Sequence, residues 1–425
     1  NMVIGYLRRQ KLIIMILSRI QAVITVLFVS AFLSMNAQEK NAPKFGKGLL
    51  NLVGQDSTWT MKVGLRFQTL GTSSWDVDNG LSNPSSSFFI RRSRLKFDGF
   101  AYSPKLKYKL ELGLSNRDQS GASSYTSNAP RYILDAVLKW NFSGNFVLWA
   151  GQTKLPGNRE RVISSANLQQ VDRSLLNSRF TIDRDMGLQL RHHFNLTDTF
   201  IVKEIFSVAQ GEGRNITTGN VGGHQYTARV ELLPFGNFAS KGDYKGSDLK
   251  FENKPKLALG VAYDLNHNAS KTRSNQGSYM FIDTSEDSKL SERVYYTTNI
   301  STLFIDAMYK HKGFSFMGEY ANREAADAFA KNTDGSLTGD VVQVGNGLNL
   351  QSGYLVSKTV EVSARYTNIS LDKKITGKGS ENQYTLGLSK YVAGHSLKVQ
   401  TDLSYTDIGF KTNQLLFRLQ VDIHF

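Results

Sequence analysis

The stretch QLLFRLQVDIHF, Gln414 to Phe425, alternates between apolar and polar side chains over most of its length. One face of an extended strand would carry Leu415, Phe417, Leu419, Val421, Ile423 and Phe425, and the other Gln414, Arg418, Gln420, Asp422 and His424. A period of two residues predicts a β-strand with one apolar face. The same period recurs in TVEVSARYT (359–367) and KLKYKLELGLSN (105–116).

The stretch FFIRRSRLKFDGF, Phe88 to Phe100, has the same period but a strongly charged face. The apolar face carries Leu95 and Phe97, and the charged face carries Arg92, Arg94, Lys96 and Asp98. On a lipid-facing strand, each central Lys or Arg would cost about 2–4 kcal/mol. If these strands cross a membrane, their charged face must therefore line an aqueous interior.

We count about sixteen alternating segments of roughly ten residues, and tilted strands of about 9–11 residues cross a bilayer. Their approximate spans are 58–70, 88–102, 105–116, 131–141, 145–153, 185–195, 199–211, 222–234, 255–265, 294–310, 313–324, 346–357, 359–370, 381–393, 395–406 and 414–425. The fold class that this predicts is all-β, a transmembrane antiparallel β-barrel of about 16 strands.

The connections between these segments alternate in length. Short turns are expected at 103–104, 141–145, 195–198, 311–313, 358 and 393–394, and long loops at 71–87, 117–130, 154–184, 266–293 and 325–345. Short periplasmic turns and long external loops are typical of outer-membrane barrels. One connection breaks the pattern, because 235–254 is long yet falls on the short-turn side.

The start of the chain predicts a secretory signal peptide. Met15 to Gln38 has one arginine, an apolar run from Ile20 to Leu33 and small residues ending at Ala37, after which we expect cleavage. A membrane anchor is the alternative, but about fourteen apolar residues are too few to span comfortably. Residues 1–14 precede the start expected at Met15 and are interpreted as an artefact of gene-start assignment.

We therefore expect a signal peptide with its extension at 1–37, a periplasmic segment at 38–57 and a barrel at 58–425. Cleavage would lower the formal charge from +15 to +11 by removing Arg8, Arg9, Lys11 and Arg19. The sequence has no cysteine, which excludes disulfides and thiolate metal sites. After the leader no run approaches the 18 apolar residues of a spanning helix.

Two competing folds are less consistent with the pattern. A secreted β-sandwich rarely keeps so many ten-residue strands in consecutive order, and a propeller would show a blade-length repeat. All seven prolines lie in the leader-proximal segment, in expected loops or at strand ends, as a continuous hydrogen-bonded wall requires. The aromatic residues expected to form an interfacial girdle are Trp59, Trp140, Trp149, Tyr295, Tyr309 and Tyr366.

The connection from Lys154 to Arg184 combines six basic and three acidic residues. It also holds apolar side chains that are unsuited to a loop in water: Leu155, Val162, Ile163, Leu168, Val171, Leu175 and Leu176. A loop that folds into the lumen and packs on the wall would account for both features. An external loop with a small apolar pad is the alternative.

At this point the sequence resembles the phosphate-selective porin O/P family of outer-membrane channels. The resemblance rests on GQTKLPGNRERVISSANLQQVDRSL (151–175), RDMGLQL (184–190) and IRRSRLKFDG (90–99). It implies a sixteen-stranded barrel, a homotrimer and a third loop folded inward as a constriction. The constriction of the family has a basic residue, two serines three and four places on, and an arginine twelve places beyond the basic residue. Here this spacing selects Arg161, Ser164, Ser165 and Arg173, although the family usually has lysine at the first position.

Weaker matches extend the candidate anion site to the wall. The resemblance assigns Arg91 and Arg92 to its strand-two pair, Arg66 to its strand-one arginine and Asp135 to its acidic partner. We add Arg94 and Lys96, which share the charged face with Arg92. Three alternatives stay open: Arg91 could lie at the headgroup level, Arg94 and Lys96 could only balance Asp98 and Glu111, and the two serines could cap a short helix.

These observations predict a passive, anion-preferring porin for phosphate or similar small oxyanions, because guanidinium groups bind oxyanions through charge-assisted hydrogen bonds. A weakly selective general porin and a structural or adhesive barrel are the alternatives. We find no Ser/His or Asp/His constellation that predicts an enzyme, expect no cofactor and expect no nucleic acid partner. His192 and His193 point to opposite strand faces, so no metal site is expected there. Expected partners are outer-membrane lipid, further copies in a trimer and, through the strand ending in Phe425, the barrel-assembly machinery.

Overall fold

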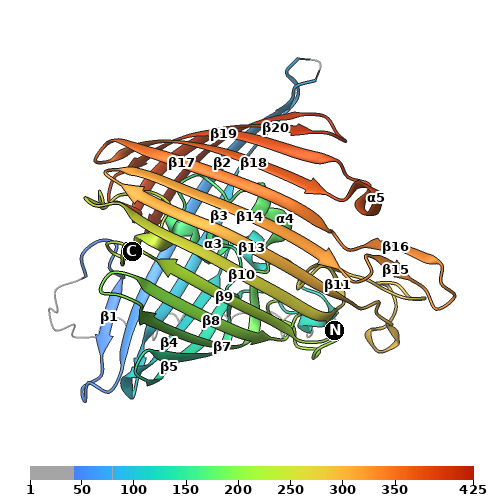
Figure 1. Cartoon of the computed structure of the whole chain (residues 1–425), viewed down its shortest axis with the longest axis horizontal. Helices are drawn as coiled ribbons and strands as arrows, with labels where there is room; N and C mark the ends of the chain where they lie inside the picture. The colour runs from blue at the N-terminus through green and yellow to red at the C-terminus, as the bar shows by residue number, and fades with distance from the viewer. Residues whose placement is uncertain (1–42, 79) are drawn as a thin grey trace, which may run out of the picture. The chain divides into compact units, whose positions relative to one another are not determined.

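The strands of this protein form one continuous antiparallel sheet that closes on itself. A computed structural model of the chain describes residues 43–78 and 80–425. The predicted signal peptide and the first residues of the predicted 38–57 segment lie outside the described residues. The sheet contains seventeen strands, of which β1 (Leu50–Val53) pairs only with the start of β2 (Thr60–Asp76). The other sixteen close into a barrel where β2 pairs with β21 (Gln414–His424), as Figure 1 shows.

Each barrel strand pairs with its neighbours in sequence, so the topology is a simple up-and-down meander. Between the seam strands β2 and β21 the wall consists of β3 (Ser82–Ala101), β4 (Ser103–Gly113), β5 (Ile133–Ser143), β6 (Phe146–Lys154), β7 (Arg184–Asn195), β8 (Ile201–Ala209), β9 (Gln225–Leu233), β10 (Lys256–Ala269), β13 (Thr298–His311), β14 (Phe314–Ala325), β17 (Gly345–Ser357), β18 (Val360–Leu371), β19 (Ser380–Tyr391) and β20 (Leu397–Ile408). The prediction of a barrel with about 16 strands is confirmed.

The remaining elements lie in connections. Two small hairpins are β11 (Lys271–Arg273) with β12 (Gln276–Tyr279) and β15 (Phe329–Lys331) with β16 (Leu337–Val341). The short helices are α2 (Asn116–Gln119), α3 (Arg159–Val162), α4 (Leu175–Phe180) and α5 (Lys373–Thr376), and 3₁₀ turns cover Ser124–Thr126, Ser165–Asn167, Gly242–Tyr244 and Leu290–Glu292. No helix within 43–78 and 80–425 is long and apolar enough to cross a membrane.

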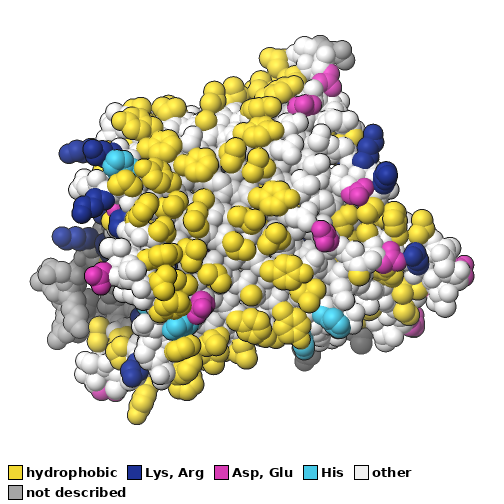
Figure 2. Space-filling model, viewed as in Figure 1, with side chains coloured by type: hydrophobic (Ala, Val, Ile, Leu, Met, Phe, Trp, Pro, Cys, Tyr) yellow, Lys and Arg dark blue, Asp and Glu magenta, His cyan; other side chains and the backbone are white. Residues whose placement is uncertain are grey.

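The two faces of the wall differ as the period of two requires. Along β19, exposed Tyr384, Leu386 and Leu388 alternate with buried Thr385 and Ser389. Figure 2 shows hydrophobic side chains spread over the outer face of the wall, with Lys and Arg gathered toward its two ends. This distribution places an apolar band on the outside and the polar side chains inside.

One predicted long loop is wrong. The segment 71–87 is mostly strand, because β2 continues to Asp76 and β3 begins at Ser82. The facing residues are small and hydroxylated: Ser74 lies opposite Ser85, and the hydroxyl oxygens of Thr72 and Ser87 are 2.9 Å apart. Such residues pair well across strands. Because they do not alternate between apolar and polar, the sequence pattern does not reveal that the two strands continue through them.

A buried ion pair crosses the barrel seam. Arg66 of β2 donates to Asp422 of β21 from Nε at 2.9 Å and from Nη2 at 2.6 Å, and the Asp422 side chain is fully buried. Two parallel bonds fix the orientation of both groups, so this pair joins the first and last strands of the ring.

We predict that Asp422→Ala destabilises the barrel by about 3–5 kcal/mol, because it leaves the Arg66 guanidinium buried without its counter-charge. The measurement is the temperature at which the folded band disappears in heat-modifiability gels. Asp198→Ala, in the exposed turn between β7 and β8, is the control and should leave this temperature unchanged. Equal melting of the two variants would contradict a role of the ion pair at the seam.

Candidate functional site: a basic cavity

The connection between β6 and β7, residues 155–183, is here called the third loop. Its turns are fixed locally by serine caps: the Ser164 hydroxyl accepts from the Ala166 amide, and the Ser174 hydroxyl accepts from the Asn177 amide at the start of α4. Other side chains of the third loop contact the wall.

The third loop contacts the wall through a buried charge network. Arg159, which is fully buried, donates to Asp306 of β13 at 2.6 Å and lies 3.4 Å from Glu231 of β9. Arg229 of β9 binds the same two carboxylates. Two guanidinium groups therefore balance two carboxylates, which is the condition under which charges tolerate burial.

Apolar side chains of the third loop form a second set of wall contacts. Leu155, Leu176 and Phe180 pack in one cluster with Phe304 and Ile369 of the wall. Ile163 and Leu168 belong to another cluster, with wall residues that include Ile201, Leu233, Met308 and Met317. These loop side chains are at most 5 % exposed. Of the apolar loop residues that we expect to pack on the wall, Leu155, Ile163, Leu168 and Leu176 belong to these clusters.

The long connection on the short-turn side, residues 235–254, packs against the third loop. The Gly246 amide donates to the Asn167 carbonyl at 2.8 Å, and Arg159 donates to the Asp243 carbonyl at 3.1 Å. Phe238 joins the Ile163 and Leu168 cluster. This segment is long because it supplies buried partners to the third loop, which accounts for the break in the pattern of turns.

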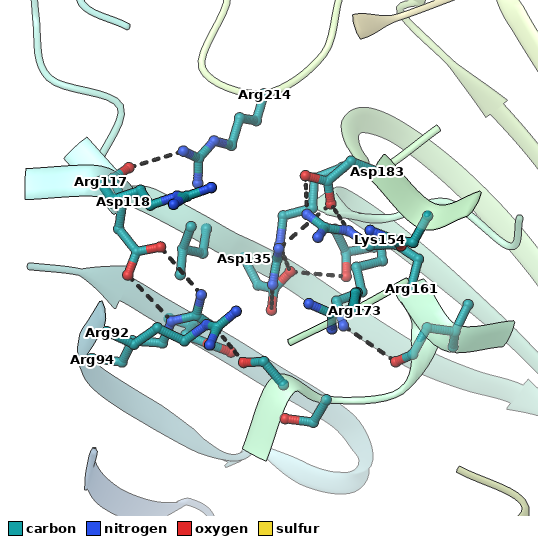
Figure 3. Close-up of a pocket in the computed structure, with 18 of the residues that line it drawn as sticks. Arg92, Arg94, Arg117, Asp118, Asp135, Lys154, Arg161, Arg173, Asp183 and Arg214 are labelled. Carbon is teal, nitrogen blue, oxygen red and sulfur yellow. Dashed lines mark hydrogen bonds and ion pairs between the residues drawn. The ribbon is translucent and has the colours of Figure 1, made fainter. Parts of the chain in front are cut away.

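A cavity of about 610 Å³ lies between the third loop and the wall strands β3 to β7 and β21. Figure 3 shows how the labelled side chains converge on it. Its lining includes fourteen basic residues and five acidic ones, a formal excess of nine positive charges. The basic residues are Arg91, Arg92, Arg94, Lys109, Arg117, Arg131, Lys139, Lys154, Arg161, Arg173, Arg184, Arg191, Arg214 and Arg418, and the acidic residues are Glu111, Asp118, Asp135, Asp172 and Asp183.

Arg91 and Arg92 both point into the cavity, and both contact Asp172 of the third loop, at 2.7 and 3.3 Å. A strict alternation would have separated them. The pairing of β2 with β3 instead skips Arg91, because Gln68 lies opposite Arg92 and Thr69 lies opposite Ile90. This β-bulge turns consecutive side chains to one side, so the alternative that placed Arg91 at the headgroup level is wrong.

The other wall candidates divide between the cavity and its surroundings. Arg94 lines the cavity and pairs with Glu111 at 3.0 Å and Asp118 at 3.2 Å. Lys96 is outside the lining and pairs with Asp98 at 2.7 Å. Arg66 is also outside it, because it binds Asp422 and the third loop at Ser165. Arg94 and Lys96 therefore both form ion pairs, as the alternative interpretation expected. Arg94 also faces the cavity.

The four residues with the family spacing all line the cavity. Arg161 forms an ion pair with Asp183. Arg173 donates only to backbone, to the carbonyls of Glu160 at 3.0 Å and Ile163 at 2.8 Å. The Ser165 hydroxyl accepts from Arg66 at 2.6 Å and from Arg94 at 3.4 Å, whereas Ser164 caps the 3₁₀ turn.

The pKa values of Arg173 and Asp172 reflect the charges around the third loop. Burial, and next the repulsion from Arg161, lowers the pKa of Arg173 to about 9. For Asp172, burial acts to raise the pKa, but Arg91 and Arg92 outweigh it and hold the pKa well below its ordinary value. The Asp172 carboxylate therefore stays ionised, whereas burial beside Arg161 disfavours the charged form of Arg173.

Asp135 lies in the wall with two cations. Arg184 donates to it at 2.8 Å, and Lys109 forms a second ion pair with it. The sequence indicates Asp135 as a site residue but not Arg184, which is the first residue of β7. The alternation of faces along β7 does not indicate Arg184, because the inward position of this residue at the strand end departs from that alternation.

Several lining residues were missed because they come from other connections. Arg131 and Arg214 lie outside the strands, and nothing in the spacing of these residues links them to the third loop. Two girdle assignments are wrong: Trp149 lines the cavity, and Tyr295 precedes β13 and packs against Tyr125 and Tyr279. A position near a strand end does not by itself decide which face an aromatic side chain occupies, and Tyr295 lies outside the strands.

The comparisons with known proteins agree with this architecture. A protein of Aquifex aeolicus (strain VF5) without a characterised function is 23% identical over 367 residues, covering 80% of this chain and 81% of that protein. Among solved structures, a loop-deletion mutant of the outer membrane protein OmpT of Vibrio cholerae aligns with a TM-score of 0.51 at 12% identity, over 87% of this chain and 100% of that one. An anion-selective porin from Comamonas acidovorans aligns with a TM-score of 0.50 at 13% identity, over 86% and 100% of the two chains.

These structural likenesses establish the fold. The family is given by the sequence, because the phosphate-selective porin O and P family model matches residues 61–414. This range holds every wall strand in full except β2, whose first residue lies outside it, and β21, of which only Gln414 lies inside it. The chain therefore belongs to the phosphate-selective porin O and P family and is a porin of the outer membrane.

Proposed function

We propose that this porin is a passive, anion-preferring channel for phosphate or similar small oxyanions, with a basic constriction made by the third loop and the wall. The observation that carries the proposal is the cavity lining of fourteen basic and five acidic residues. Closely spaced cations on a low-dielectric wall raise the local concentration of anions and speed their entry. Flux would follow the concentration gradient without an energy source.

The proposal that the third loop folds into the lumen draws support from its burial and its partners. It contacts side chains of β9 and β13 through Arg159, and Lys398 of β20 donates to the Leu168 carbonyl at 2.9 Å. Arg365 of β18 donates to the Asp172 carbonyl at 2.8 Å. Bonds to such widely separated strands support a third loop that crosses the space enclosed by the ring and would leave a passage on the side of β3 to β7.

Within the constriction, the residues fall into two roles. Arg173 offers an unneutralised guanidinium group, and Ser164 and Ser165 offer hydroxyls that replace part of the water around an anion. Arg91, Arg92, Arg94 and Arg161 are already bound to carboxylates, which weakens their hold on a passing anion. Weak, multiple sites suit a channel, because binding must permit release.

The same ion pairs favour a second candidate function, a general diffusion porin with weak selectivity. Asp172, Asp183 and Asp118 each neutralise part of the arginine charge. The two functions differ in how strongly inorganic phosphate blocks the chloride current through the channel. Strong block identifies oxyanion binding, and absence of block identifies the weakly selective porin.

We also propose, from the resemblance to the family, that the protein assembles as a homotrimer. From the pattern of residues 15–38 we propose that it is exported with cleavage after Ala37. Residues 38–57 would then begin the mature chain in the periplasm. Gel electrophoresis without heating checks the trimer, and N-terminal sequencing of the protein from membranes checks the cleavage site.

We predict that Arg161→Ala and Arg173→Ala each lower the anion-to-cation permeability ratio, by about twofold or more, because each removes a cation from the narrowest part of the proposed path. Reversal potentials in planar bilayers under a salt gradient measure this ratio. Lys289→Ala is the control, because its side chain is 82% exposed in the connection before β13. A cation-preferring wild type would refute the proposed function, and unchanged selectivity in both variants would refute the constriction.

A separate prediction concerns residues 235–254. Replacing 236–253 by a short glycine-serine connection should raise the conductance and lower the anion preference, because the third loop loses its hydrogen bond from Gly246 and its apolar contact with Phe238. Single-channel recording measures both quantities. A comparable shortening of the external connection at 282–292 is the control, and equal conductance of both shortened proteins would contradict the prediction.

A further inference from the structure

One feature of the cavity is unlike the rest of its lining. Trp149 of β6 lines the cavity, and its direct cross-strand partner on β5 is Lys139. The Lys139 Nζ lies 3.9 Å from the centroid of the indole ring, and the Arg191 Cζ, from β7, lies 3.8 Å from it. Because β5 and β7 flank β6 on opposite sides, the two cations approach the ring from opposite neighbours.

The two cations also differ from the arginines near the third loop. In the part of the chain that the structure describes, Lys139 and Arg191 make no ion pair, and the side-chain acceptor of Arg191 is the neutral amide of Gln189, at 2.7 Å. By contrast, Arg91, Arg92 and Arg161 each have a carboxylate partner. The charge of Lys139 and Arg191 therefore remains available to a solute.

An aromatic ring is suited to hold such cations. A cation over an indole face gains about 0.5–2 kcal/mol from the ring quadrupole, and the ring carries no net charge. A carboxylate would fix the same side chains but would cancel their attraction for an anion. Trp149 thus orders two long, flexible side chains along the wall while leaving their positive charge uncompensated.

The position of this group separates it from the third loop. Lys139 follows Asp135 by four residues on β5, about 13 Å along the strand, toward the short turn at Gly144. Arg191 lies in the corresponding half of β7, seven residues beyond Arg184 and four before the strand ends. An anion released near Asp135 and Arg184 toward the short-turn end would meet Lys139 and Arg191 next.

We propose that Lys139, Arg191 and Trp149 form a second anion-binding site, on the short-turn side of the third loop, in which Trp149 is the positioning residue. The ligand class is a small oxyanion such as inorganic phosphate, which the ammonium and the guanidinium group beside the indole ring would both attract. The inference rests on the proposed function, because it adds a step to the same path. Two weak sites in series let an anion leave the first without crossing uncharged wall.

The test uses the full-length porin in planar bilayers, with inorganic phosphate as the blocker of the chloride current. Trp149→Leu should raise the half-blocking phosphate concentration by about threefold or more. Trp149→Phe, which is closer in size to leucine than to tryptophan but keeps an aromatic face, should stay within about twofold of wild type. In a Lys139→Gln and Arg191→Gln background, Trp149→Leu should have no further effect. Heat-modifiability gels verify that each variant is folded.

Equal phosphate block in the Leu and Phe variants would overturn the proposal, because the ring face would then have no role. An equal effect of Trp149→Leu with and without the two cations would also overturn it, because the tryptophan would then act through packing alone. A wild-type channel that prefers cations would instead refute the proposed function, and with it this site. The variant comparisons and the wild-type reversal potential therefore separate the two failures.

Discussion

Closure of the sheet is the constraint on which the rest of this protein depends. Every wall strand is hydrogen-bonded on both sides, and the ring is completed where β2 meets β21. A closed wall in a membrane has an apolar outer face, so charged side chains must point inward. The interior then holds many charges in little space, and each one needs a partner to remain there.

The interior satisfies this need in two ways that differ in consequence. Ion pairs such as Arg159 with Asp306 are buried and neutral overall, and they fasten the third loop to the wall. Other cations are ordered by groups without a full negative charge: backbone carbonyls for Arg173 and an indole ring for Lys139 and Arg191. The ion pairs hold the third loop in its position. The cations without a carboxylate partner keep a positive potential that attracts an anionic solute.

The sequence predicted those features that follow from periodicity. Strand number and the inward orientation of Arg92 and Arg94 follow from a period of two, and the structure agrees with them. The expected alternation of short turns and long loops fails at 71–87, where β2 and β3 continue. Features that depend on an irregularity were not predictable. The bulge at Arg91 adds one residue to a strand, and no local composition marks it.

The candidate site was predictable in part for the same reason. Arg161, Ser164, Ser165 and Arg173 belong to one continuous segment, so the resemblance to the family could select them by their spacing, and all four line the cavity. Asp172 lies in that segment too, but its role depends on a contact with β3, about eighty residues earlier, and long-range contacts leave no trace in a single sequence. The position of Trp149 near a strand end predicts a place at the membrane interface, but that position does not decide which face of the wall its side chain occupies.

The hydrogen bond from Gly246 to Asn167 has a consequence for the order of assembly. Its two residues belong to connections that enter from opposite ends of the barrel, one between β6 and β7 and the other between β9 and β10. Neither connection can form its buried contacts with the other until both pairs of flanking strands are part of the wall. Contacts between segments so distant in sequence form slowly. Filling of the interior should therefore be a late folding step, after strand pairing has brought the two hairpins together.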